Sequence, residues 1–174
     1  MSQESETVKQ PLPEPWLRGP IEGVQPFVMP VFFSFAQVRE DLVRHTAGLT
    51  HEQDWRIVGR NSVGFHLKHI AGSVDRLTTY LCGLQLSPSQ LEYLKREHDP
   101  DAGLQELLER MEQSLAACEH ALSRLDAATI FDPRAVGRRA LPTTVLGLIV
   151  HLAEHTQRHL GQLITLAHIV RQPA

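Results

Sequence analysis

Three histidines recur at intervals of four in the segment 150–162, VHLAEHTQRHLGQ, at positions His151, His155 and His159. Residues four apart in an α-helix lie on one face, one turn from each other, so these side chains form a column. Two neutral imidazoles at this spacing can direct ring nitrogens at one divalent ion, about 2.0–2.1 Å from each. The column therefore predicts part of a metal site. His155 and His159 continue an apolar stripe, whereas His151 falls at its edge.

The same spacing occurs in the His-Glu-x-x-His motif of zinc proteases, where the glutamate is the general base. Here TQR separates His155 from His159, so that glutamate is missing and a zinc protease is excluded. A hydrolase would need another base, and the nearest acidic residues in sequence are Glu154 and Asp75. We expect Glu154 to be a solvated surface charge. Asp75 and Arg76 are expected to form a solvated or intrahelical charge pair.

A third ligand has to come from another segment, and the sequence FHLKHIAG at 65–72 offers His66 and His69. Helical geometry alone favours His66, which lies close to the apolar stripe that runs from Val63 to Ile70. His69 falls farther round, toward a boundary between two neighbouring helices. A lone histidine on an apolar face is usually a hydrogen-bonded core residue. Two at a spacing of four, with two more on a second helix, favour a metal site, and both second-helix candidates stay open at this point.

The elements that position these histidines follow from apolar residues recurring at three and four. Proline, serine and glycine at the segment ends fit helix starts and stops. Nothing alternates with a period of two, and no hairpin signal such as Asn-Gly appears, so no strand is expected. The periodicity predicts four long helices and one short one, over 30–47, 63–82, 100–125 and 143–170, with the short helix over 88–97.

These helices predict an all-α fold, a four-helix bundle in one domain over 30–174. A proline-rich, extended N-terminal arm over 1–29 precedes it. With 174 residues and 42% hydrophobic content the chain is long enough for one sizeable core. Cys82 and Cys118 lie inside expected helices and are interpreted as reduced core thiols.

Charge and hydropathy exclude several classes of partner. A net charge of −3 and a pI near 6.3 argue against a nucleic-acid surface, which normally needs a basic excess. No apolar run is long enough to span a membrane, and the N-terminus has neither the basic start nor the apolar run of a signal peptide. We expect a cytoplasmic protein that acts on a small molecule.

Two stretches, HIAGSVDRL from His69 and HLAEHTQRHLGQL from His151, resemble the DinB-like or YfiT-like family of metal-dependent four-helix-bundle proteins. Carried over residue by residue, the resemblance implies His69, His155 and His159 as the metal ligands. It implies nickel or zinc as the metal, an up-down-down-up bundle and a homodimer. We follow it to His69, with His66 as the rival and the role of His151 unassigned.

The resemblance also implies a function, because some relatives are enzymes that use mycothiol or bacillithiol. Three histidines leave a divalent ion an open position for water or substrate. A thiol bound there is deprotonated, and it could attack a small electrophile as in a thiol-dependent S-transferase. A metal-bound water with its pKa near 7 would make the protein a hydrolase instead. Two further alternatives are a non-catalytic metal- or small-ligand-binding stress protein and a bundle whose histidines serve packing.

Overall fold

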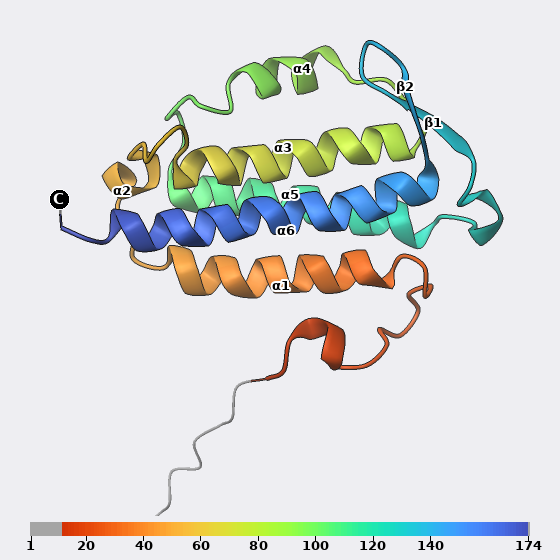
Figure 1. Cartoon of the computed structure of the whole chain (residues 1–174), viewed down its shortest axis with the longest axis horizontal. Coiled ribbons are helices and arrows are strands. Elements are labelled where there is room, and N and C mark those ends of the chain that lie inside the picture. Colours follow the sequence, from red (N-terminus) through yellow and green to blue (C-terminus); the bar gives the residue numbers. More distant parts are fainter. Residues whose placement is uncertain (1–11, 174) are drawn as a thin grey trace, which may run out of the picture.

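The computed structural model describes residues 12–173 as a helical bundle with a small hairpin at one end (Figure 1). The expected all-α class is confirmed, since most of the chain is helical. Short 3-10 turns lie at Pro15–Leu17 and Ala127–Thr129. The longer elements are α1 (Met29–Thr46), α2 (His51–Trp55), α3 (Val63–Leu81), α4 (Pro88–Lys95), α5 (Leu104–Ser123), β1 (Pro133–Val136), β2 (Leu141–Thr144) and α6 (Val145–Val170).

Helix α3 is central to the bundle, because it packs against both α5 and α6, while α1 packs on the other side of α6. Figure 1 shows α1 and α6 running in one direction along the bundle and α3 and α5 in the other. Helix α4 lies across the outside of α3 and returns the chain to the end where α5 begins. The apolar stripes of the four long helices meet in one core, whose largest fully buried side chains include Phe35, Leu67, Ile70, Met111, Leu115, Leu152 and Leu163.

The two histidine-bearing helices begin at side-chain caps. The hydroxyl of Ser62 accepts a hydrogen bond from the backbone N–H of Phe65, as expected for the residue before α3. Thr144 does the same for the N–H of Gly147 at the start of α6. Each cap satisfies one of the backbone donors that a helix start leaves unpaired. These caps fix where each helix begins and hence which residues face its neighbours.

The hairpin corrects the expectation that the chain has no strand. Strands β1 and β2 pair antiparallel, with Val136 opposite Leu141, and Ala140 in the turn takes a left-handed φ of 49°. Thr143 and Thr144 therefore belong to β2, so α6 begins two residues later than expected. Four-residue strands with a proline in each are too short to show alternation, which is why periodicity missed them.

The other expected helices differ from the structure at their ends. Helix α4 ends at Lys95 and α5 begins at Leu104, so the intervening residues 96–103 form a polar loop rather than extending either helix. Helix α2 lies between the expected helices 30–47 and 63–82, where no helix was predicted. Its Trp55 packs flat on α3 at Gly64 and donates its indole N–H to the carbonyl of Ala102 at 3.0 Å.

The two cysteines differ in their surroundings. Cys118 lies in the core as expected, and burial raises the pKa of its thiol to about 12. Cys82 is exposed, which corrects the expectation that it is a core thiol. It is the C-cap residue that follows Leu81, the last residue of α3.

The N-terminal arm is described only from residue 12 onward, and residues 1–11 of the expected arm lie outside the described residues. Arg18 in the arm pairs with Glu40 of α1 through both guanidinium Nη atoms. Pro15 is buried, so this part of the arm packs against the bundle. None of the described helices combines the length and the apolar character that crossing a membrane requires.

Candidate metal centre

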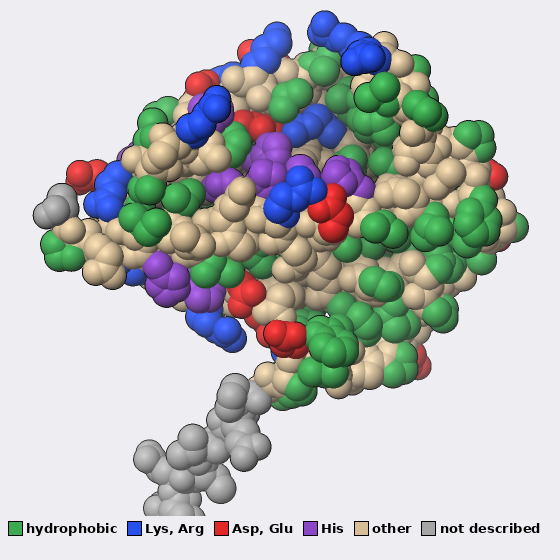
Figure 2. All heavy atoms as spheres, viewed as in Figure 1, with side chains coloured by type: hydrophobic (Ala, Val, Ile, Leu, Met, Phe, Trp, Pro, Cys, Tyr) green, Lys and Arg blue, Asp and Glu red, His purple; other side chains and the backbone are tan. Residues whose placement is uncertain are grey.

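Three histidines from two helices converge on the face between α3 and α6. His69 comes from α3, and His155 and His159 come from successive turns of α6. One ring nitrogen from each lies within 4.8 Å of the other two, so this group could hold a metal ion. The side chains are partly exposed, and Figure 2 shows histidines gathered in a hollow of this face. The group is therefore partly open to solvent on this face.

The spacing of the nitrogens fits a divalent ion. The Nε2 atoms of His69 and His155 are 3.1 Å apart. Two nitrogens that each lie about 2.0–2.1 Å from one tetrahedral ion are separated by about 3.3 Å. The rings of His155 and His159 are tilted by 60° to each other, with centroids 4.5 Å apart. The distance between the His69 and His155 nitrogens is therefore close to the spacing that a tetrahedral ion imposes.

His66 lies behind this group, away from solvent. Its side chain is 1% exposed, and its Nδ1 is 3.2 Å from Nδ1 of His159. One of these two nitrogens carries the proton that the other accepts. The helical wheel was correct in placing His66 on the inward stripe. The residue that joins the two α6 histidines is nevertheless His69, which sits at the boundary where α3 faces α6.

His151 lies one turn from His155 and is half-exposed. Its Nδ1 is 2.6 Å from a carboxylate oxygen of Glu154, which also pairs with Arg158. The Arg158 guanidinium, followed by His151, holds the pKa of Glu154 below its usual range. Glu154 is exposed as expected, although it is ion-paired. His151, Glu154 and His155 form a second group with ligand atoms within 4.8 Å, which shares His155 with the first.

Glu97 is the residue at this centre that the sequence did not reveal. One carboxylate oxygen lies 2.7 Å from Nδ1 of His69, and the other accepts a hydrogen bond from Arg76 at 2.8 Å. The expectation of a solvated Asp75–Arg76 pair is wrong. Arg76 is buried against Glu97, whereas the exposed Asp75 accepts a hydrogen bond from Gln90. Glu97 was expected to be the last residue of the short helix over 88–97, but it lies in the loop beyond α4.

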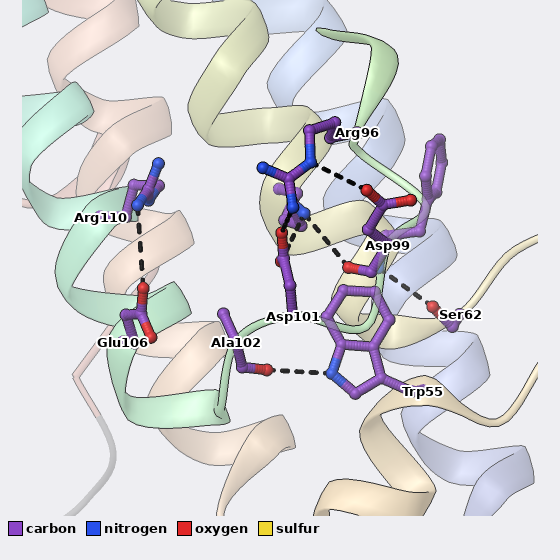
Figure 3. Close-up of polar contacts among 10 residues, drawn as sticks. Trp55, Ser62, Arg96, Asp99, Asp101, Ala102, Glu106 and Arg110 are labelled. Carbon is purple, nitrogen blue, oxygen red and sulfur yellow. Dashed lines mark hydrogen bonds and ion pairs between the residues drawn. The ribbon is translucent and has the colours of Figure 1, made fainter. Parts of the chain in front are cut away.

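The loop 96–103, which carries Glu97, is also held by polar contacts that do not involve the histidines (Figure 3). The buried ammonium of Lys68 donates to the Asp99 carbonyl at 3.1 Å and to the Asp101 carboxylate at 2.8 Å. Arg96 bridges the carboxylates of Asp99 and Asp101. Lys68 directly precedes His69 in α3. Of these two neighbouring side chains, Lys68 contacts the loop and His69 belongs to the candidate metal centre.

His155 and His159 of the centre, and His66 behind them, each have a pKa below the usual range of histidine. Burial, followed by the positive charges of neighbouring histidines, lowers the pKa of His66, His155 and His159 to about 4. A neutral imidazole has a lone pair available for a metal ion, whereas an imidazolium has none. Nδ1 of His155 is also buried without a hydrogen-bond partner among the described residues. The arrangement is suited to binding a cation through nitrogen.

Comparisons with known proteins bear on the same residues. The family model of the DinB superfamily matches residues 34–163, about three quarters of the chain. The matched range includes His69, His155 and His159 together with Glu97. A search among curated proteins found none that matches the chain.

Proposed function

This chain belongs to the DinB superfamily, and on that basis we propose that it is a divalent-metal-dependent enzyme whose ligands are His69, His155 and His159. The observation that carries the proposal is the convergence of these three histidines, with one nitrogen of each within 4.8 Å of the others. Nickel or zinc is the metal that we propose, because imidazole nitrogen suits both ions.

We further propose that the reaction is transfer of a low-molecular-weight thiol to a small electrophile. A bound divalent ion with an open position supplies a Lewis acid that favours the thiolate form of a thiol. Three neutral imidazoles contribute no negative charge to the site, so an anionic ligand such as a thiolate is favoured. The hollow in Figure 2 gives a small molecule access to the histidines.

Hydrolysis is the weaker alternative, because the nearest candidate for a general base is poorly suited to that role. Glu154 pairs with both Arg158 and His151, and its pKa lies below the usual range. A base is most effective when its pKa lies near the operating pH. Glu97 is buried between His69 and Arg76, so both of its oxygens are already occupied.

The metal proposal is tested by measuring metal content and binding in the untagged protein. We expect about one equivalent of Ni²⁺ or Zn²⁺ per chain in the wild type. His69→Ala, His155→Ala and His159→Ala are each expected to lose stoichiometric binding. The matched control is His151→Ala, which removes a half-exposed histidine from the same face of α6 and should retain binding. A wild-type protein that neither holds nor takes up a divalent metal would refute the metal proposal.

The reaction is tested by a conjugation assay with several low-molecular-weight thiols and a small electrophile. Activity is expected to require the metal and to be lost in His155→Ala and His159→Ala. Conjugation that continues at the wild-type rate in these variants would rule out the proposed role of the centre. Metal binding without conjugation or hydrolysis would leave a non-catalytic binding protein. The homodimer and the cytoplasmic location expected from the sequence stay predictions.

A further inference from the structure

Among the described residues, Glu97 contacts the metal centre through His69, and both of its oxygens have hydrogen-bond partners. The carboxylate is buried, with a side chain that is 4% exposed. Oε2 lies 2.7 Å from Nδ1 of His69, and Oε1 accepts from Nη2 of Arg76 at 2.8 Å. An ionised carboxylate can only accept hydrogen bonds. The proton of a neutral His69 must therefore sit on Nδ1, which leaves the lone pair on Nε2.

That lone pair is directed at the other candidate ligands, since Nε2 of His69 is 3.1 Å from Nε2 of His155. We propose that Glu97 is a positioning residue that fixes His69 as the Nδ1–H tautomer and so presents Nε2 to the metal. The part of this inference that concerns metal affinity rests on the proposed function. The part that concerns the tautomer does not, because it is a property of the metal-free protein.

The place of Glu97 is set by contacts that do not involve the histidines. Lys68 fixes the loop downstream of Glu97 through the Asp99 carbonyl and the Asp101 carboxylate. Arg76, one turn beyond Gly72 on α3, holds the carboxylate from the side opposite His69. The acceptor is therefore in position before a metal binds. The competing explanation is that Glu97 only neutralises the buried charge of Arg76.

Glu97→Gln separates these explanations, because an amide is not symmetric. Arg76 has only donors, so it binds the carbonyl oxygen of the introduced glutamine. The amide NH₂ then faces Nδ1 of His69, which must become an acceptor, and the proton moves to Nε2. The variant thus places a proton on the nitrogen that would bind the metal. Adding Arg76→Met frees the glutamine to turn its carbonyl toward His69, which restores the Nδ1–H tautomer.

The first measurement is the tautomer of His69 in metal-free protein, from the ¹⁵N shifts of its ring nitrogens after selective histidine labelling. We expect the Nδ1–H form in the wild type, the Nε2–H form in Glu97→Gln and a return to Nδ1–H in Arg76→Met/Glu97→Gln. The second measurement is the dissociation constant for Ni²⁺ and Zn²⁺ by chelator competition. Glu97→Gln is expected to bind about 10–100-fold more weakly, and the double variant to recover most of that loss.

The matched control is Glu119→Gln, which removes a carboxylate from the remote ion pair with Arg39 and should alter neither readout. The double variants Arg76→Met/Glu97→Gln and Arg76→Met/Glu97→Leu bury no unpaired charge, so they decide the question even where Glu97→Gln alone does not fold. Of these two, only Arg76→Met/Glu97→Gln retains an acceptor for Nδ1 of His69. It should therefore bind metal at least tenfold more tightly than Arg76→Met/Glu97→Leu.

The outcomes separate this inference from the proposed function. An Nδ1–H tautomer that persists in Glu97→Gln, with metal affinity within threefold of the wild type, would overturn the role of Glu97 and leave the metal centre standing. A wild type that binds no metal defeats the proposed function. The tautomer series then still decides whether Glu97 fixes His69.

Discussion

At the scale of single residues, the neutral state of the buried histidines makes the stability of the metal-free protein depend on pH. The pKa of His66, His155 and His159 is about 4 in the folded protein, against 6.5 for an unperturbed histidine. Between these values the unfolded chain binds more protons than the folded one. The free energy of unfolding therefore falls as the pH is lowered from 6.5 toward 4, by at most about 1.4 kcal/mol per pH unit for each histidine.

Urea denaturation of the chelator-treated protein at pH 6.5, 6.0, 5.5 and 5.0 measures this slope, above the range where most carboxylates titrate. His155→Gln and His159→Gln should each reduce it, because each removes one histidine that the folded protein keeps neutral. A free energy of unfolding that stays constant over this range would contradict the prediction.

Some residues of the centre could be predicted from the sequence and others could not, for physical reasons. His155 and His159 were found because both lie on one helix, where spacing alone fixes their relation. His66 and His69 could not be separated from the sequence without a family resemblance, since the neighbour that each faces depends on how α3 packs. Glu97 was missed because its contact with His69 depends on the path of a loop. Arg76 was misjudged with it, because its partner is that same glutamate.

At the scale of elements, Gly72 lets α4 lie close to α3. A Cβ atom at this position would come within 2.7 Å of the Tyr93 ring and 2.8 Å of the Arg76 guanidinium. Gly72→Ala is therefore expected to lower the free energy of unfolding by about 1–3 kcal/mol, as overpacking does. Gly161→Ala in α6 is the control, because nothing lies within 4 Å of its Cβ position.

Gly161→Ala should raise stability by about 0.5–1 kcal/mol through helix propensity alone. Thermal and urea unfolding of the two variants therefore test for effects of opposite sign. If Gly72→Ala also stabilised the protein, the close packing of α4 on α3 would not be a constraint.

The helices and the hairpin show what periodicity can predict about elements. The long helices each repeat their apolar stripe over several turns, so their existence and register could be read from the sequence. Their ends could not be read as well, because the loop 96–103 and the start of α6 depend on contacts with other segments. The contact of Lys68 with Asp101, for example, joins residues 33 positions apart.

At the scale of the whole molecule, a metal held by His69, His155 and His159 would tie α3 to α6. A ligand that binds only the folded state at about 100 times its dissociation constant stabilises that state by about 2.7 kcal/mol. For a chain of this size that corresponds to a rise in Tm of about 5–10 °C. We expect Ni²⁺ or Zn²⁺ to produce this shift and a chelator to reverse it.

Differential scanning fluorimetry with and without metal measures the shift, and His155→Ala should show none. Metal also binds weakly to histidines of an unfolded chain, which reduces the effect. An equal shift in the wild type and in His155→Ala would mean that the stabilising ion binds elsewhere.

The packing of Trp55 has an optical consequence. Its indole lies on Gly64 of α3 and is hydrogen-bonded to Ala102, at the end of the loop that carries Glu97. The other tryptophan, Trp16, is 60% exposed in the N-terminal arm. A water-soluble quencher therefore reaches Trp16 first, and the emission that remains comes from Trp55. The chain thus contains a native fluorophore that senses the loop beside the metal centre without any added label.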